Sequence, residues 1–364
     1  MRVLFCLAGL HRVPRGAEVA FEAVARQLAT TGDEVTLMGG GRPRPDDPYR
    51  FVHVPYLDRR RFERWPNLPA LRTAAGYEGV SALGGELLRY RPDDYDVTVT
   101  CGYPFENWLL RRPARSGRPA HVWVTQNGDW PASTDVAEYR WFGCDTLLCT
   151  NPIYAERNAA RWRCALVPNG VDTSRFAPGP GERARFRLPT GRPVVLMVSA
   201  LDPNKRVLEA IRAVAAVDDT ELVVAGDGPL REQVDRLAGE LLPGRFRRTT
   251  VAATEMPALY RSADVVLHTA LDESFGNVYV EALATGVPIV AHRTTTTEWI
   301  LGEHARLVDT TDPALLIEAV RSALADTGAD RRAARVAAAA DRFAWSVVGA
   351  GYRAALEAAV ASRS

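Results

Sequence analysis

Two glutamates separated by seven residues, Glu273 and Glu281, are the first candidates for chemistry in this chain. They lie in the segment DESFGNVYVEALATG, residues 272–286. Residues 276–284 are mostly apolar and small, and residues 287–291 have the pattern of a buried parallel strand, which predicts a well-packed helix between them. An unpaired carboxylate on such a helix is costly. Glu281 therefore needs a hydrogen-bond donor or a ligand.

Glu273 occupies a different position, because Ser274 and Gly276 indicate a loop that leads into the helix N-terminus. Free backbone N–H groups at a helix N-terminus favour an anion such as phosphate. One carboxylate thus lies beside a potential phosphate site, and the other lies about two helical turns further on. This layout suits a sugar nucleotide, with hydroxyls at each end and a diphosphate between them. The alternative is a solvated Glu273 and a Glu281 paired with a neighbouring arginine.

Length and composition narrow the class of protein. The 364 residues are enough for two domains, and 47% hydrophobic with 24% charged residues is ordinary for a globular protein. A net charge of +1 supplies no global field for nucleic acid. No apolar run approaches the roughly 18 to 20 residues of a membrane helix, and the N-terminus has the pattern of a first strand, so we expect a cytoplasmic protein. Five cysteines without a C-x-x-C pair predict unpaired thiols: Cys6, Cys101, Cys144, Cys149 and Cys164.

Short β-branched segments alternate with helical patterns along the first half of the chain, and a second such series begins at residue 192. This alternation predicts parallel, doubly wound α/β sheets. Ligands bind such sheets at the carboxyl ends of the strands, so the loops that follow the strands are the places to look for chemistry.

The loop at residues 9–18 places Gly16 directly before a predicted helix, where glycine lets a phosphate approach the backbone. Arg15 could supply a phosphate contact of its own, or it could simply be exposed.

Residues 58–65, DRRRFERW, form the most basic segment of the chain, with Phe62 and Trp65 between the charges. Such a segment could touch a membrane surface or an anionic acceptor. The alternative is a solvated loop beside a helix.

Two further loops, at residues 102–108 and 125–131, are polar and aromatic, and each follows a predicted strand. Aromatic planes combined with amide and carboxylate groups suit sugar recognition, because a pyranose has apolar faces and a polar rim. The residues expected to contact an acceptor are Tyr103, Glu106, Asn107 and Trp130.

The segment at residues 165–178 contains Pro-Asn-Gly-Val-Asp followed by Phe176, and the two glutamates lie in an E-x-F-G…E-A setting. At these motifs the chain resembles the family 4 retaining glycosyltransferases, and weaker similarity extends over nearly its whole length. The resemblance implies the GT-B architecture, in which two Rossmann-like domains face each other across a cleft. Residues 1–168 would bind the acceptor and residues 169–345 the nucleotide sugar, and residues 346–364 would form a helix that packs back on the first domain.

The resemblance also implies roles for individual residues. Glu273 would contact the donor sugar, Glu281 would hold the ribose hydroxyls, and Lys205 would neutralise the leaving diphosphate. An arginine usual in the family is replaced by Ala200, and Arg206 is the candidate for supplying the missing charge. The other donor contacts expected from the family pattern are Arg15, Gly16, Gly226, Met256, Ser274, Phe275, Gly276 and Asn277.

The loop at Gln126-Asn127-Gly128-Asp129 departs from the family, in which many members carry a histidine. An asparagine cannot exchange a proton near neutral pH, so Asn127 would position sugar hydroxyls through a buried amide. Asp129 is then the neighbour able to accept a proton. The alternative is that Asn127 and Gly128 form a plain turn with the amide in water.

The resemblance predicts transfer of a sugar, with retention, from a nucleotide sugar (a uridine diphosphate sugar before others) to an acceptor hydroxyl. The pathway would be that of a glycan, a glycolipid or another natural product. No Asp-x-Asp motif occurs where the diphosphate should bind, so we expect neither a metal nor another cofactor. The alternatives are a nucleotide-sugar epimerase or phosphorylase of the same fold, and a non-catalytic sugar-nucleotide binding protein.

Overall fold

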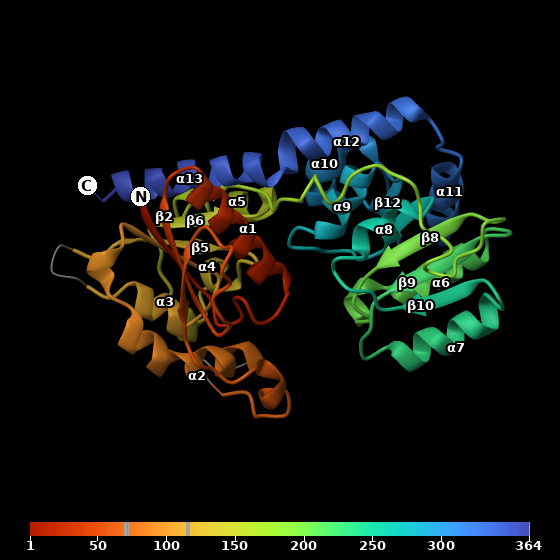
Figure 1. Ribbon diagram of the computed structural model, residues 1–364. Coiled ribbons are helices and arrows are strands. Elements are labelled where there is room, and N and C mark those ends of the chain that lie inside the picture. Colours follow the sequence, from red (N-terminus) through yellow and green to blue (C-terminus); the bar gives the residue numbers. More distant parts are fainter. Residues whose placement is uncertain (69–70, 72, 114–116, 364) are drawn as a thin grey trace. The chain divides into compact units, whose positions relative to one another are not determined.

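The computed structural model describes residues 1–68, 71, 73–113 and 117–363 (Figure 1). The chain divides into two compact units. The N-terminal unit contains Met1–Asn169 and the helix that begins at Trp345, and the C-terminal unit is Gly170–Ala344. The division thus falls within the Pro-Asn-Gly-Val-Asp segment, between Asn169 and Gly170. Ser364, the last residue of the predicted C-terminal helix, lies outside the described residues.

The N-terminal unit is built on a seven-stranded parallel sheet in the order β3-β2-β1-β4-β5-β6-β7. Its strands are β1 (Arg2–Cys6), β2 (Glu34–Gly39), β3 (Arg50–His53), β4 (Val97–Thr100), β5 (Ala120–Val124), β6 (Thr146–Cys149) and β7 (Cys164–Leu166). The predicted doubly wound α/β sheet is confirmed. Successive strands are added to one side of β1 up to β3 and to its other side from β4 onwards. The switch point of the sheet therefore lies between β1 and β4, where the loops after these two strands open.

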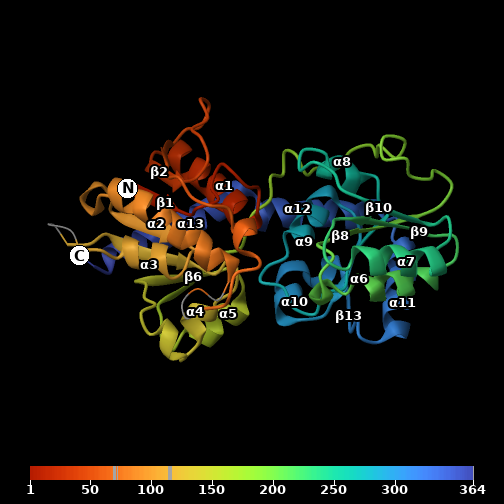
Figure 2. The same cartoon turned by 90° about the horizontal axis from the view of Figure 1, so that it is seen from below.

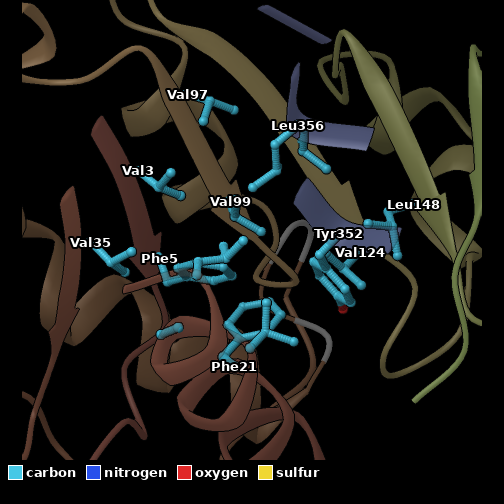
Figure 3. Packing of buried hydrophobic residues seen from close by; sticks show 14 of the residues in the cluster. Val3, Phe5, Phe21, Val35, Val97, Val99, Val124, Leu148, Tyr352 and Leu356 are labelled. Atoms are coloured by element: carbon cyan, nitrogen blue, oxygen red, sulfur yellow. The ribbon is translucent and has the colours of Figure 1, made fainter. Parts of the chain in front are cut away.

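Both faces of this sheet are covered by helices, because buried side chains alternate between the faces along each strand. Val3 and Phe5 of β1 pack towards α1 and α13 (Figure 3). Leu4 and Cys6 point to the opposite face, where α2 and α3 lie (Figure 2). The helices of this unit are α1 (Gly16–Thr30), α2 (Ala74–Arg89), α3 (Phe105–Leu110), α4 (Trp130–Ser133), α5 (Pro152–Asn158) and α13 (Trp345–Ala361), with short 3-10 turns η1 (Arg59–Phe62), η2 (Pro92–Asp94) and η3 (Ala137–Tyr139).

The C-terminal unit repeats the plan with a six-stranded parallel sheet in the order β10-β9-β8-β11-β12-β13. Its switch point lies between β8 and β11. The strands are β8 (Val194–Val198), β9 (Glu221–Ala225), β10 (Phe246–Thr249), β11 (Val265–His268), β12 (Ile289–His292) and β13 (Arg306–Val308).

Two groups of helices cover this second sheet. One face packs on α8 (Met256–Arg261), α9 (Asn277–Thr285), α10 (Thr295–Leu301) and α12 (Ala329–Phe343). The other packs on α6 (Val207–Ala215), α7 (Arg231–Leu241) and α11 (Pro313–Leu324). The remaining 3-10 turns are η4 (Pro203–Lys205) and η5 (Gly302–His304).

Helix α13 completes the core of the N-terminal unit although it comes last in the sequence. It lies against α1 and against β4, β5 and β6. Tyr352 and Leu356 are 1% and 0% exposed in this contact (Figure 3). A single residue, Ala344, separates α13 from α12, and the Val171 N–H donates to Phe343 O at 2.7 Å beside this junction.

All five cysteines are free thiols. Cys6, Cys101 and Cys149 are buried, whereas Cys144 and Cys164 are half-buried. Among the described residues, no helix combines the length and apolarity that a membrane crossing would require.

Leu356→Ala should destabilise the chain by about 2–5 kcal/mol, because it leaves a cavity between α13 and the sheet. Urea-induced unfolding measures the change. Leu315→Ala is the matched control, since Leu315 on α11 is 49% exposed and its truncation should cost less than about 0.5 kcal/mol. Equal unfolding midpoints for the two variants would show that α13 does not stabilise the core.

Candidate functional site

Lys205, His268 and Glu273 meet at the switch point of the C-terminal sheet. Lys205 ends η4, which follows β8, and His268 is the last residue of β11. Both side chains engage the same carboxylate oxygen, Oε1 of Glu273: the Lys205 ammonium forms an ion pair with it, and His268 Nε2 donates to it at 2.8 Å. The exposed fractions of the Lys205 and Glu273 side chains are 20% and 15%, so this charged pair is accessible from solvent.

The backbone around this ion pair is fixed by Thr269, the residue after β11. Its hydroxyl donates to the carbonyl oxygens of Lys205 and Arg206, both at 2.9 Å. The two loops after β8 and β11 are thereby tied together. The backbone that carries Lys205 is consequently fixed to the sheet, while the Lys205 ammonium is held by Glu273.

The ionisation of Glu273 follows from the same contacts. Burial alone would raise the pKa of this carboxyl, but the hydrogen bond and charge of His268 and the ammonium of Lys205 outweigh burial and hold the pKa below its ordinary value. Glu273 is therefore a carboxylate at neutral pH.

The N-terminus of α9 begins four residues after Glu273. Gly276 precedes the helix with φ = 84°, a conformation that glycine adopts without strain. A Cβ on Gly276 would also lie 2.5 Å from the ring of Tyr279. Phe275 is 1% exposed and packs edge-on against Phe343, so it anchors the loop while the backbone of residues 274–277 carries the polar groups. Ser274 and Asn277 are half-buried in this loop.

Glu281 lies on α9 and accepts a hydrogen bond from the Tyr260 hydroxyl at 2.7 Å. Burial raises the pKa of Glu281 to about 7, and neither this hydrogen bond nor the more distant charge of Arg175 offsets it. Tyr260 itself packs edge-on against Phe176, the aromatic residue of the Pro-Asn-Gly-Val-Asp segment. That segment thus supports the partner of Glu281.

Glycines bring the loops after β8 and β9 close together. A Cβ on Gly226 would lie 1.8 Å from Ser199 O, and one on Gly228 would lie 2.8 Å from the Leu201 nitrogen. Any larger residue would push apart the loop that carries Lys205. Gly226, predicted as a donor contact, is thus also needed to build the site.

Two other residues predicted to contact the donor, Met256 and Arg206, lie outside the Lys205–His268–Glu273 cluster. Met256 begins α8 and is partly buried against the same core as Tyr260. Arg206 adopts φ = 53°, and its guanidinium donates to Thr310 Oγ1 at 3.1 Å. The Arg206 guanidinium is therefore held by Thr310, which follows β13, and does not contact Glu273.

In the N-terminal unit, Arg15 is engaged by carboxylates. Its guanidinium donates to both oxygens of Glu78, at 2.9 and 3.1 Å, and approaches Glu18 at 3.4 Å. Gly16 is the first residue of α1, as expected. Arg15 is therefore paired with a carboxylate and not simply exposed, and its contact with a phosphate stays a prediction.

The loop after β5 corrects two expectations. Asn127 is exposed and not buried as expected, and its amide donates to Cys101 Sγ at 4.0 Å. Asp129 is 3% exposed and accepts from Arg157 Nε at 2.9 Å and from Asn158 Nδ2 at 2.6 Å. This carboxylate anchors α5 to the loop, and its contacts are with interior partners.

The residues expected to contact an acceptor separate into two groups. Trp130 is 41% exposed and can present aromatic surface, whereas Tyr103, against which it packs edge-on, is only 8% exposed and belongs to the interior. Asn107 is fully buried and donates to Gly143 O at 2.9 Å, so it belongs to the interior. Glu106 is 4% exposed, burial raises its pKa to about 7, and it lies against Gly79 and Gly102. The interior positions of Asn107 and Glu106 remove them from the predicted acceptor contacts.

Two functional neighbours, His268 and Tyr260, were missed in the sequence. His268 ends a strand five residues before Glu273, and a polar residue at a strand end is the signal that could have identified it. Tyr260 lies 21 residues before Glu281 on another helix, and no local pattern connects the two.

Two family models match the chain. The model of "Glycosyltransferase Family 4" matches residues 14–175, and that of "Glycosyl transferases group 1" matches residues 180–342. Together they span most of both units. The chain belongs to the family 4 glycosyltransferases.

Curated relatives are similar over part of their length. The GDP-mannose-dependent alpha-(1-6)-phosphatidylinositol monomannoside mannosyltransferase of Mycolicibacterium smegmatis is 39% identical over 208 residues, which cover 50% of this chain and 53% of that protein. The 2-deoxystreptamine glucosyltransferase of Streptomyces kanamyceticus is 34% identical over 212 residues, covering 54% and 52%. The chain spans about half the length of each of these two relatives in the matches.

Solved structures share the fold over the whole chain. Sucrose-phosphate synthase from Thermosynechococcus elongatus superposes with a TM-score of 0.77 at 18% identity and 100% coverage of both chains. The Anabaena protein HepE, solved in complex with UDP-glucose, superposes with a TM-score of 0.72 at 17% identity. The superposition covers 98% of this chain and 100% of the HepE chain. The fold is therefore GT-B.

The raised pKa of Glu281 predicts how stability depends on pH. Between its ordinary pKa of 4.5 and its folded value of about 7, the folded chain holds a proton that the unfolded chain releases, so stability falls as pH rises through this window. The Glu281→Gln variant cannot ionise at this position. Its stability should therefore fall by about 1–3 kcal/mol less than that of the parent across the window.

Thermal unfolding of parent and variant at a series of pH values tests this expectation. Glu240→Gln, a change at an exposed position on α7, serves as control and should follow the parent. Parallel curves for parent and Glu281→Gln would mean that Glu281 titrates like a solvated carboxyl.

Proposed function

We propose that this protein transfers a sugar, with retention at the anomeric carbon, from a nucleotide-sugar donor to an acceptor hydroxyl. The observation that carries the proposal is the Lys205–Glu273–His268 cluster at the switch point of the C-terminal sheet, next to the N-terminus of α9. Sheets of this kind bind nucleotides at the switch point, and a helix N-terminus favours phosphate.

Each end of the cluster fits one part of the donor. A diphosphate at the N-terminus of α9 would meet backbone N–H groups and the Lys205 ammonium, a cation that Glu273 and the Thr269 contacts already hold in place. Glu281, about one turn along α9, would accept hydrogen bonds from the ribose hydroxyls beside Tyr260. Glu273 would contact the sugar.

In the reaction, the bond between the anomeric carbon and the diphosphate oxygen breaks, and a bond to the acceptor oxygen forms on the same face of the sugar. The acceptor hydroxyl gives its proton to the departing diphosphate. The Lys205 ammonium and the N–H groups of α9 stabilise the negative charge that grows on that diphosphate, and the carboxylate of Glu273 lies beside the positive charge that grows on the sugar.

The donor is proposed from the relatives. The mannosyltransferase from Mycolicibacterium smegmatis is named as dependent on GDP-mannose, and so is a second mannosyltransferase of that organism, 37% identical over 125 residues. GDP-mannose is therefore the first donor to test, ahead of the uridine diphosphate sugar predicted from sequence. Thermal stabilisation by a panel of guanosine and uridine diphosphate sugars compares the two directly.

The acceptor is proposed to be a hydroxyl of a lipid-linked or small polyol molecule bound by the N-terminal unit. The names of the relatives include a phosphatidylinositol mannoside and 2-deoxystreptamine, both polyols. Trp130 is the exposed aromatic residue that would contact it, with the buried Tyr103 packed behind it.

The two glutamates should differ in kinetic effect. Glu273→Gln should lower kcat on the order of a hundredfold with a smaller change in donor affinity, because its contact is made at the reacting sugar. Glu281→Ala should weaken donor binding by about tenfold or more, through loss of hydrogen bonds to the ribose. Steady-state kinetics with titration calorimetry of the donor separates the two effects.

The control for both variants is Glu240→Gln. If Glu273→Gln binds the donor normally and also turns over normally, the catalytic assignment fails. If every variant binds the donor but the parent itself neither transfers nor hydrolyses it, the chain is a sugar-nucleotide binding protein and the transferase proposal fails.

Transfer should continue in excess chelator, because Lys205 and the N-terminus of α9 take the part that a metal ion plays at other diphosphate sites. Initial rates with and without chelator, using dialysed protein, measure this. Loss of activity that magnesium or manganese restores would contradict the expectation.

A further inference from the structure

Exposed large apolar side chains are concentrated in one short stretch of the N-terminal unit. Of the fifteen in the described part of the chain, six fall between residues 57 and 88. They are Leu57, Trp65, Leu68, Val80, Leu87 and Leu88. This stretch contains η1 and α2 and belongs to the N-terminal unit, whereas the Lys205–Glu273 site belongs to the C-terminal unit.

Helix α2 presents one apolar face to solvent. Val80, Leu87 and Leu88 are spaced by seven and eight residues, which places them on the same side of the helix. Their exposed fractions are 37%, 44% and 82%. Leu57, itself 46% exposed, is held beside this face because its N–H donates to Ser81 Oγ at 2.9 Å.

Trp65 extends this apolar surface and is fixed in place. Its ring packs edge-on against Phe62 at 5.0 Å and against Tyr77 of α2 at 5.2 Å, measured between centroids, yet it remains 54% exposed. The Tyr77 hydroxyl donates to Pro66 O at 2.6 Å, which ties the residue after Trp65 to α2. A rigid, half-exposed tryptophan is typical of side chains that sit at the headgroup level of a bilayer.

Three arginines border the apolar side chains. Arg60, Arg61 and Arg64 are exposed, and none forms an ion pair with another residue of the described chain. Arg59 differs, because its guanidinium lies 3.4 Å from Glu78. Glu63 is the one exposed acidic residue between these arginines, so the segment keeps an excess of positive charge.

We propose that this surface, formed by η1, Trp65 and the exposed face of α2, docks the N-terminal unit on an anionic lipid bilayer. The arginines would meet the anionic headgroups, Trp65 would lie among the headgroups, and Leu57, Leu87 and Leu88 would enter the acyl boundary. The three arginines favour an anionic bilayer, because an uncharged bilayer would offer them no headgroup of opposite charge. The proposal does not depend on the proposed transferase activity.

Flotation of the full chain with vesicles tests the docking. The parent should bind vesicles of equal parts phosphatidylcholine and phosphatidylglycerol, and should not bind phosphatidylcholine alone. Binding should weaken as salt is raised, because salt screens the headgroup charge. Arg60→Glu/Arg61→Glu and, separately, Leu88→Asp should each lower the partition coefficient at least about tenfold.

Matched controls lie on exposed positions of the C-terminal unit. Arg212→Glu/Arg236→Glu changes the net charge equally, and Leu315→Asp removes an equally apolar side chain. Both should bind vesicles like the parent, and all variants should keep the parent's melting temperature. Absent binding of the parent, binding unchanged in the surface variants, or binding lost equally in the controls would overturn the proposal. Self-association that Leu88→Asp abolishes, without vesicle binding, would assign the surface to a second copy of the chain instead.

Discussion

The ion pair between Lys205 and Glu273 joins two loops that are 68 residues apart in the chain, and the proposed donor site depends on it. Removing a charged group from water is costly, so the pair persists only because further hydrogen bonds support both partners. His268 donates to Glu273, and Thr269 holds the backbone of Lys205. The result is a cation and a carboxylate fixed at the carboxyl ends of β8 and β11 before any ligand arrives.

The rest of the C-terminal unit maintains this arrangement. The parallel pairing of β11 with β8 places the two loops side by side, and Gly226 allows the neighbouring loop to approach within the space that a methyl group would occupy. Gly276 turns the chain so that α9 starts directly after Glu273 and leads to Glu281. The two carboxyls then differ in ionisation: charged neighbours lower the pKa of Glu273, whereas burial raises that of Glu281.

The fold could be predicted from the sequence because alternating strand and helix patterns are local signals. The candidate donor residues could be proposed for the same reason, since Glu273, Gly276 and Glu281 lie on one short segment. Contacts between distant segments were not accessible: Tyr260 reaches Glu281 from another helix, and Glu78 reaches Arg15 across 63 residues. For two other residues, local polarity was taken for exposure. Asn107, predicted to contact the acceptor, donates to an interior carbonyl, and Asp129, predicted to accept a proton, is buried and accepts from Arg157.

The central claim is that a nucleotide sugar binds with its diphosphate between Lys205 and the N-terminus of α9. A crystal structure of the full chain with GDP-mannose tests it most directly. The account predicts phosphate oxygens within hydrogen-bond distance of Lys205 Nζ and of the backbone N–H groups at residues 275–277, with the ribose hydroxyls on the Glu281 carboxylate. Nucleotide bound elsewhere, with Lys205 and Glu281 both keeping only their present partners, would contradict it.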